Sequence, residues 1–156
     1  MKYTTYVRTS LGLIGISETD GFITELFLEK DMQKDGGGPK TSLLEKAEKQ
    51  LTEYLSGNRA DFDLPLAAEG TEFQKTVWDA LRKIPYGQTR SYKQVAQMIG
   101  KPSASRAVGM ANNKNPLLIL TPCHRVVGAD GKLVGYAAGL DIKEKLLEME
   151  RTHLGC

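Results

Sequence analysis

The chain has 156 residues, of which 40% are hydrophobic and 26% are charged, and its formal net charge is +2. A chain of this length buries about 70% of its unfolded surface, so it can hold a core without disulfides or a structural metal. It has no apolar run near the ~20 residues that cross a bilayer, and its first residues lack the apolar segment of an export signal. We therefore expect a cytoplasmic globular protein of one or two small domains, without membrane association.

The cysteine count points to a free thiol. Only two cysteines and two histidines are present. The cysteines, Cys123 and Cys156, lie far apart, and such a count supports neither a disulfide framework nor a structural zinc site. We predict a free thiol at Cys123 and no bound metal, and we assign no role to Cys156.

Charge divides the chain into two unlike halves. Residues 1–70 carry 8 basic and 12 acidic side chains, a balance of −4, whereas residues 71–156 carry 13 and 7, a balance of +6. Between Lys75 and Arg125, nine basic residues accompany a single acid, Asp79. This segment is typical of a surface that binds a polyanion, although a solvated basic surface has the same composition.

The first half predicts an antiparallel meander followed by a helix. Residues 3–8, 11–17 and 22–28 alternate or run apolar, and glycine-containing breaks separate them. The polar, glycine-rich residues 31–39 are expected to form a mobile surface loop. A helix then begins at Thr41-Ser42, with Ser42 and Glu45 as a capping box, and ends at Gly57.

A domain boundary is expected near residue 68. Residues 58–70 show no periodicity and coincide with the change in charge sign. We therefore predict a strand-rich N-terminal α/β domain over residues 1–68 and a second domain over residues 69–156.

The second half begins with three helical segments. Apolar residues recur at helical spacing over 73–84; Ser91 can then cap a helix over 92–99, and Ser103 a helix over 104–111. Two short helices separated by the turn Gly100-Lys101-Pro102 match a helix-turn-helix. A helical corner that binds no ligand is the alternative.

A hairpin and a last helix are expected to complete this domain. Residues 117–120 predict a short apolar strand, and Val126-Val127 and Leu133-Val134 flank a turn signal at 128–131. Asp141 and Glu144 offer an N-terminal cap for a helix that reaches about Met149. The predicted fold class is therefore α+β, with a small N-terminal antiparallel-sheet domain followed by a winged helix-turn-helix-like domain.

The pair Cys123-His124 is the candidate for chemistry. A thiol with a pKa of about 8.5 needs a neighbouring base or cation to ionise, and His124 and Arg125 are the local candidates. In an extended chain these neighbours point to opposite faces, so contact between them requires a turn at Pro122 or a bridging water. A carboxylate that orients the imidazole would complete the set, but spacing does not single out Glu150. A structural thiol beside a surface histidine is the alternative.

The sequence resembles the O6-alkylguanine-DNA alkyltransferases, also called methylated-DNA–protein-cysteine methyltransferases. The motif Pro122-Cys123-His124-Arg125-Val126 carries the resemblance, with Asn115-Pro116 before it and Gly135-Tyr136 and Gly139-Leu140 after it. Further matches follow in the family's order and spacing: Phe73-Gln74, Val77-Trp78, Ile84-Pro85 with Gly87, Ser91-Tyr92, Arg106-Ala107-Val108-Gly109, and Lys143 with Leu146-Leu147.

The resemblance implies a DNA-repair protein that acts once. It implies that the alkyl group of O6-alkylguanine, and of O4-alkylthymine, in double-stranded DNA moves irreversibly to Cys123 without a cofactor. We also expect a monomer. It implies a ribonuclease H-like N-terminal domain. Its catalytic roles fall on Cys123 as acceptor, His124 as water-mediated base, Glu150 as orienting acid, Asn115 as brace of the turn, and Tyr92 as proton donor to guanine.

The resemblance also implies a DNA-binding face and a base pocket. Arg106 would fill the space of the extruded base, and the helix that carries it is expected in the minor groove. Further DNA contacts are implied for Ala104, Ala107, Gly109, Lys101 and Tyr92, and pocket positions for Val126, Tyr136 and Ala137.

Two other functions remain open at this stage. A winged-helix damage sensor would bind alkylated DNA without changing its own mass. A Cys-His-Glu hydrolase would turn over small esters or amides catalytically.

Overall fold

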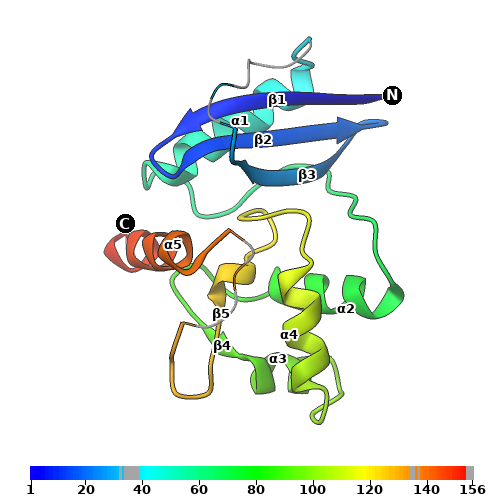
Figure 1. Cartoon of the computed structure of the whole chain (residues 1–156), viewed down its shortest axis with the longest axis vertical. Helices are drawn as coiled ribbons and strands as arrows, with labels where there is room; N and C mark the ends of the chain where they lie inside the picture. Colours follow the sequence, from blue (N-terminus) through cyan, green and yellow to red (C-terminus); the bar gives the residue numbers. More distant parts are fainter. Residues whose placement is uncertain (32, 34–38, 134–135, 137, 154–156) are drawn as a thin grey trace. The chain divides into compact units, whose positions relative to one another are not determined.

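The structure is a computed structural model that describes residues 1–31, 33, 39–133, 136 and 138–153. The chain divides into two compact units, Met1–Glu69 and Gly70–Cys156 (Figure 1). Most of the predicted loop at 31–39, together with Val134, Gly135, Ala137 and Cys156, lies outside the described residues. In the described part, no helix is both long and apolar enough to cross a membrane.

The first unit is built on a three-stranded antiparallel sheet. Its strands are β1 (Lys2–Thr9), β2 (Gly12–Thr19) and β3 (Phe22–Glu29), in the order β1-β2-β3. The turn between β2 and β3 contains Asp20 and Gly21, both with positive φ, at the position where a tight hairpin requires them. The central strand β2 is buried along most of its length. The predicted meander is confirmed.

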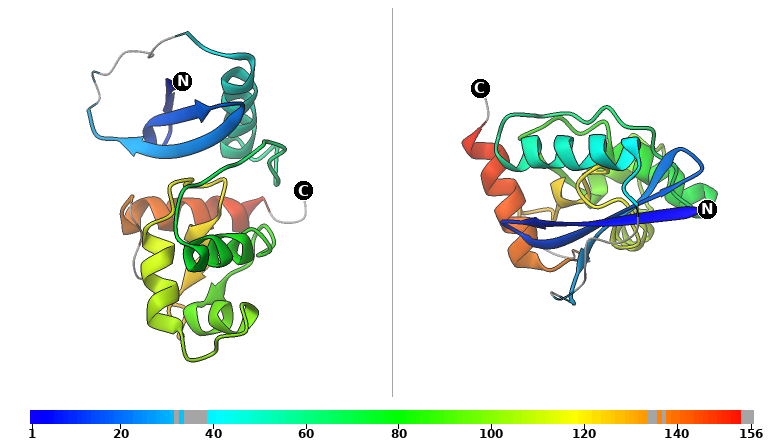
Figure 2. Two further views of the ribbon diagram at one scale, coloured as in Figure 1. Left: turned by 90° about the vertical axis from the view of Figure 1, so that its right-hand side faces the viewer. Right: turned by 90° about the horizontal axis from the view of Figure 1, so that it is seen from above.

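Helix α1 (Ser42–Leu55) packs against this sheet, and the right-hand view of Figure 2 shows it lying along the strands. Its buried positions recur at helical spacing and include Leu44, Leu51 and Tyr54. The capping box predicted for Ser42 and Glu45 is wrong by one residue, because Thr41 is the N-cap and its hydroxyl accepts a hydrogen bond from the Leu44 amide at 3.1 Å.

The second unit is mainly helical. Helices α2 (Glu72–Leu81), α3 (Tyr92–Met98) and α4 (Ser105–Asn113) pack against one another, and α5 (Leu140–Thr152) follows near the end of the chain. The indole N–H of Trp78 donates to the carbonyl of Ala111 at 2.8 Å, which joins α2 to α4. The two helices α3 and α4, joined by a short glycine-containing turn, form the pair expected for a helix-turn-helix.

Two predicted caps in this unit are wrong. Helix α4 begins after Ala104, which offers no side-chain cap, and Ser103 is not its cap. The amide of Ala104 instead donates to the carbonyl of Lys101 at 2.9 Å, so the backbone turn sets the start of the helix. Helix α5 begins after Gly139, whose φ of 105° suits glycine, and Asp141 lies within its first turn rather than at the cap.

The apolar run 117–120 is a buried turn rather than the predicted strand. Ile119 has a positive φ of 72°, and the Thr121 amide donates to the carbonyl of Leu117 at 2.9 Å. The run is apolar because it is buried, and apolarity alone does not distinguish a strand from a buried turn.

The predicted hairpin has a different pairing. Strand β5 (Val126–Val127) pairs in parallel with β4 (Arg90–Ser91). The turn signal is real, since the Gly128 amide donates to the carbonyl of Lys132 at 2.8 Å. Leu133 does not belong to a strand, and its expected partner in the second arm, Val134, is not among the described residues.

The two serines that were expected to cap helices give a direct stability test. Ser91 caps α3, because its hydroxyl accepts from the Gln94 amide at 3.1 Å, whereas Ser103 caps no helix. We expect Ser91→Ala to lower the free energy of unfolding by about 1 kcal/mol. Ser103→Ala is the matched control and should change it by less than about 0.5 kcal/mol. Urea denaturation of the full chain measures both, and equal effects would contradict the assigned caps.

Candidate active site

The loop before the reactive cysteine is shaped by one buried amide side chain. Asn115 Oδ1 accepts from the Leu117 amide at 2.9 Å, while Nδ2 donates to the carbonyls of Leu117 and Thr121 at 3.2 and 2.8 Å. These bonds satisfy backbone groups that a buried turn would otherwise leave unpaired. Asn115 therefore holds the two ends of the turn together.

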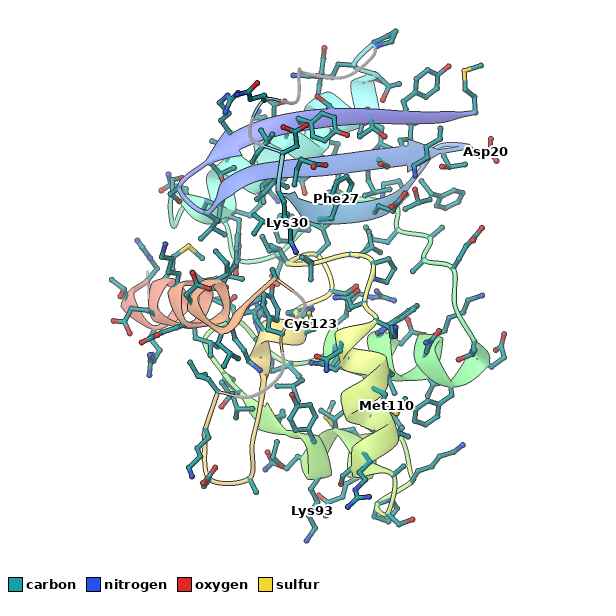
Figure 3. The ribbon with its side chains drawn as sticks, in the orientation of Figure 1. Asp20, Phe27, Lys30, Lys93, Met110 and Cys123 are labelled. Carbon is teal, nitrogen blue, oxygen red and sulfur yellow. The ribbon has the colours of Figure 1, made fainter. Side chains whose placement is uncertain are left out.

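The loop leads into a short turn that carries the candidate nucleophile. Residues Cys123–Arg125 form a single turn of 3-10 helix after Pro122, and the Arg125 amide donates to the Pro122 carbonyl at 3.0 Å. The chain therefore turns here, as contact between the side chains of Cys123 and His124 would require. Figure 3 labels the Cys123 side chain at the start of this turn. Cys123 is buried, with 1% of its surface exposed.

A buried carboxylate lies at the centre of the site. Glu150 on α5 contacts His124 Nε2 through Oε2 at 2.7 Å. Arg125 donates to the same carboxylate through Nε at 2.9 Å and Nη2 at 3.0 Å, and the Gly87 amide donates to Oε1 at 3.2 Å. Such bidentate, charge-assisted contacts fix the geometry of both partners. The spacing of the sequence could not select this acid, but the fold brings it to the imidazole.

These contacts set the protonation states of the pair. Burial alone would raise the pKa of Glu150, but hydrogen bonds and charges from His124 and Arg125 outweigh it and lower that pKa to about 2. Burial lowers the pKa of His124, and the hydrogen bond to Glu150 opposes that shift only in part. At neutral pH the site therefore contains an ionised carboxylate beside a neutral imidazole that can accept a proton.

The thiol itself is protonated in the resting site. Burial raises the pKa of Cys123 to about 11, although a hydrogen bond from Asn115, the charge of Lys143 and a hydrogen bond from Tyr136 act in the opposite direction. Arg125, the other local candidate, binds Glu150 and the carbonyl of Ile84 through its guanidinium, and it is not among the groups that shift the pKa of the thiol. Without a base, very little of this thiol is ionised at neutral pH.

Two tyrosines accompany the thiol. Tyr92, the first residue of α3, has a pKa raised by burial and by the negative charge that Cys123 can carry. Burial and the same charge raise the pKa of Tyr136 well above its usual value. Both phenols therefore stay protonated at neutral pH and can act as hydrogen-bond donors. Val126, also predicted for the pocket, is fully buried in β5.

The predicted DNA-binding residues lie on and before α4. Arg106 and Ala107 are exposed, and Ala104 and Gly109 are half-buried. A Cβ atom added to Gly109 would lie 3.8 Å from the ring of Tyr92, so this side of α4 faces the start of α3. Lys101 is exposed in the turn, with Nζ 5.5 Å from the centre of the Phe73 ring.

Lys143 is the residue whose significance the sequence analysis missed. It is fully buried on α5, two turns before Glu150, and burial lowers its pKa to about 8 while the charge of Cys123 acts against this shift. A signal was present, because this lysine lies beside Ile142 within the apolar stripe of the helix. A buried lysine requires a polar or charged neighbour.

The described residues contain no cluster of three His, Cys, Asp or Glu side chains that could hold a metal ion. What they do contain is a buried thiol, a neutral imidazole bound to an ionised carboxylate, and a pair of packed helices with a basic exposed side. These features define a thiol-dependent site on a helix-turn-helix-like unit.

Comparison with known proteins places the chain in a family. Residues 72–152 match the "6-O-methylguanine DNA methyltransferase, DNA binding domain", and residues 1–68 match the "6-O-methylguanine DNA methyltransferase, ribonuclease-like domain". The chain belongs to the 6-O-methylguanine DNA methyltransferase family, as its motifs indicated, and its α+β fold class is confirmed.

Relatives and solved structures agree with this assignment. The methylated-DNA–protein-cysteine methyltransferase of Methanosarcina barkeri is 62% identical over 70% of this chain and 69% of its own length. The constitutive enzyme of Bacillus subtilis is 45% identical over 97% of this chain and 96% of its own length. The crystal structure of Mycobacterium tuberculosis O6-methylguanine methyltransferase has a TM-score of 0.90 at 38% identity, covering 100% of this chain and 96% of that one. The structure of Mycobacterium tuberculosis OGT in complex with DNA has a TM-score of 0.86 at 40% identity, over 95% and 92% of the two chains.

The charge of Lys143 can be tested through the reactivity of the thiol at neutral pH. Lys143→Met should slow alkylation of Cys123 by iodoacetamide, because the lysine, with a pKa of about 8, is still protonated there and its charge favours the thiolate. Lys145→Met, at an exposed position of the same helix, is the control and should leave this rate unchanged. Mass spectrometry of the Cys123 peptide after timed alkylation measures both. An unchanged rate in Lys143→Met would refute the electrostatic role.

The low pKa of Glu150 predicts how stability depends on pH. A carboxyl whose folded pKa lies near 2, against 4.5 ordinarily, stabilises the fold above pH 4.5, and this contribution disappears as the pH falls toward 2. Between pH 4.5 and pH 2, the free energy of unfolding should therefore fall less in Glu150→Gln than in the original protein, by on the order of 2 to 3 kcal/mol. Glu148→Gln, at an exposed position of α5, should behave like the unmodified protein. Denaturation midpoints measured across this pH range test the prediction. The midpoints of Glu150→Gln and of the original protein should converge as the pH falls, and midpoints that fall in parallel would contradict the low pKa of Glu150.

Proposed function

We propose that this protein is a methylated-DNA–protein-cysteine methyltransferase that moves the alkyl group from O6 of guanine in double-stranded DNA to Sγ of Cys123. The observation that carries this function is the buried Cys123 thiol beside His124, whose imidazole is bound to the ionised Glu150 at 2.7 Å. The family membership and the names of its relatives support the same activity. We include O4-alkylthymine as a second substrate.

His124 acts as the base. The ionised Glu150 carboxylate accepts a hydrogen bond from Nε2–H, so the neutral imidazole keeps its basic lone pair on Nδ1. Nδ1 takes the thiol proton through a bridging water, as the family resemblance implies. Glu150 then stabilises the imidazolium that forms, in the manner of the acid in other nucleophile-His-acid sites. The charge of Lys143 and the hydrogen bond from Asn115 stabilise the thiolate.

The transfer is a single displacement. The thiolate forms a bond from Sγ to the alkyl carbon while the bond from that carbon to O6 breaks, and the electron pair of this bond remains on guanine. Tyr92 donates its phenolic proton to the guanine anion, a role consistent with a pKa raised by burial and by Cys123. The product is a thioether, which has no easy leaving route. Each molecule therefore reacts once.

The second unit supplies the DNA-binding surface. An alkyl group on O6 lies within the base stack, so the nucleotide must leave the stack at a cost of a few kcal/mol. Arg106, exposed on α4, fills the vacated space, and Lys101 contacts phosphates. The small residues Ala104, Ala107 and Gly109 allow α4 to approach the DNA backbone. Val126, Tyr136 and Ala137 line the pocket that receives the base.

Several further expectations belong to this proposal. Chemistry and DNA binding are assigned to residues 69–156, and a supporting role to residues 1–68. We expect a monomer that needs neither a metal nor a small-molecule cofactor and that acts in the cytoplasm. These expectations stay predictions.

The reaction itself is tested by mass. Incubation of the full chain with a duplex containing O6-methylguanine should add one methyl group per protein molecule, and peptide analysis should place it on Cys123. Cys123→Ser should accept none, and the peptide with Cys156 should stay unmodified. Mass spectrometry of the intact protein and of its peptides measures both. A methyl group elsewhere, or none at all, contradicts the proposed acceptor.

The same experiment separates the alternatives. A damage sensor would bind the duplex and keep its mass. A Cys-His-Glu hydrolase would release product from small esters over many turnovers, whereas a single-use acceptor stops at one equivalent of alkyl group.

A further inference from the structure

The exposed side of α4 carries a large apolar side chain that the proposed reaction does not use. Met110 lies in the middle of the helix and is 70% exposed (Figure 3). Among the exposed large hydrophobic residues of the described chain, it is the one on α4. A single exposed apolar side chain is common on protein surfaces, so its neighbours on the helix decide whether it has a role.

The fold keeps Met110 away from the core. Val108 and Ala111 form the buried side of α4, and Gly109 faces the ring of Tyr92. The indole of Trp78 is bonded to the carbonyl of Ala111, which fixes the rotation of the helix. Met110 therefore stays on the outer side whatever rotamer it adopts.

Met110 shares this outer side with the arginine that is proposed to enter the base stack. It lies four residues after Arg106, so the two side chains are neighbours on one face, about 6 Å apart along the helix axis. A duplex close enough for Arg106 to enter its stack therefore covers Met110 as well.

The charge around Met110 selects the kind of partner. Helix α4 contains no acidic residue, and the basic side chains of Lys101, Arg106 and Lys114 are exposed before, on and after it. A surface with an apolar centre and a basic surround is complementary to a nucleic-acid groove, where sugars offer apolar contact between rows of phosphates.

We propose that Met110 is an apolar DNA contact that packs into the groove next to Arg106 and helps to hold the duplex open at the extruded base. The inference rests on the proposed function. Methionine suits this position because its unbranched thioether adapts to irregular surfaces. Proteins that open the minor groove use apolar wedges, methionine among them, to unstack adjacent bases. Such a contact adds affinity without releasing counterions.

The test measures affinity for an unmodified duplex at several salt concentrations. Met110→Ala should bind about tenfold more weakly at every salt concentration, since it removes an apolar contact. The slope of log K against log salt should stay unchanged, because no charge is lost. Lys101→Ala should instead reduce this slope by about one, because it removes a phosphate contact. Met110→Leu, which keeps an apolar side chain of similar volume, should bind like the unmodified protein.

Two controls exclude a general effect of truncating an exposed methionine. Met98→Ala removes an exposed methionine from α3, where Met98 is 42% exposed, and should leave duplex affinity unchanged. Transfer from the free O6-methylguanine base should proceed at the same rate in Met110→Ala, while transfer from the duplex slows. The inference is overturned if Met110→Ala binds duplex normally, if Met98→Ala is equally impaired, or if transfer from the free base falls as much as transfer from the duplex.

Failure of this inference can be told apart from failure of the proposed function. If the protein without substitutions gains no methyl group on Cys123, the proposed transfer reaction is wrong, and duplex affinity still decides the role of Met110. If that protein is methylated and Met110→Ala binds and reacts with the duplex equally well, only the role of Met110 is wrong.

Discussion

The second unit depends on the contacts of a single buried carboxylate. Glu150 on α5 joins the turn that carries His124 and Arg125 to the backbone of Gly87, three segments that lie far apart in the sequence. An ionised group without these donors would be costly to bury, and breaking such a set by removing one partner destabilises a protein by roughly 3 to 5 kcal/mol. The contacts that hold the unit together therefore also orient the imidazole of His124. A substitution at Glu150 would change the stability and the chemistry together.

Burial of the thiol has a chemical consequence. A Cys123 pKa of about 11 keeps the resting thiol protonated, so it is poorly reactive toward small electrophiles and oxidants. An acceptor that is used once gains from this restraint, because any side reaction inactivates the molecule. Ionisation then depends on His124, Asn115 and Lys143, all of which are fixed by packing.

Helix α4 is proposed to combine two kinds of DNA contact. Basic side chains on and before it, Arg106 and Lys101, would provide attraction that depends on salt, while small residues and Met110 would provide close, apolar approach that does not. The fixed rotation of the helix places both on one side. The proposed extrusion of a base needs both, because attraction to phosphates holds the duplex and the apolar contact offsets the lost stacking.

Local patterns in the sequence determined the meander, the helices α1 to α5 within a few residues and the Ser91 cap, because alternation, helical spacing and turn residues act over short distances. The sequence also singled out the adjacent Cys123-His124 pair as the candidate for chemistry. The motif order also identified the family. Only the tertiary structure decided the rest: Thr41 rather than Ser42 as a cap, residues 117–120 as a buried turn, β4 as the partner of β5, Arg125 on Glu150, and the charge of Lys143 acting on the thiol. The last three depend on which distant segment supplies a hydrogen bond or a charge, and spacing along the chain does not encode that.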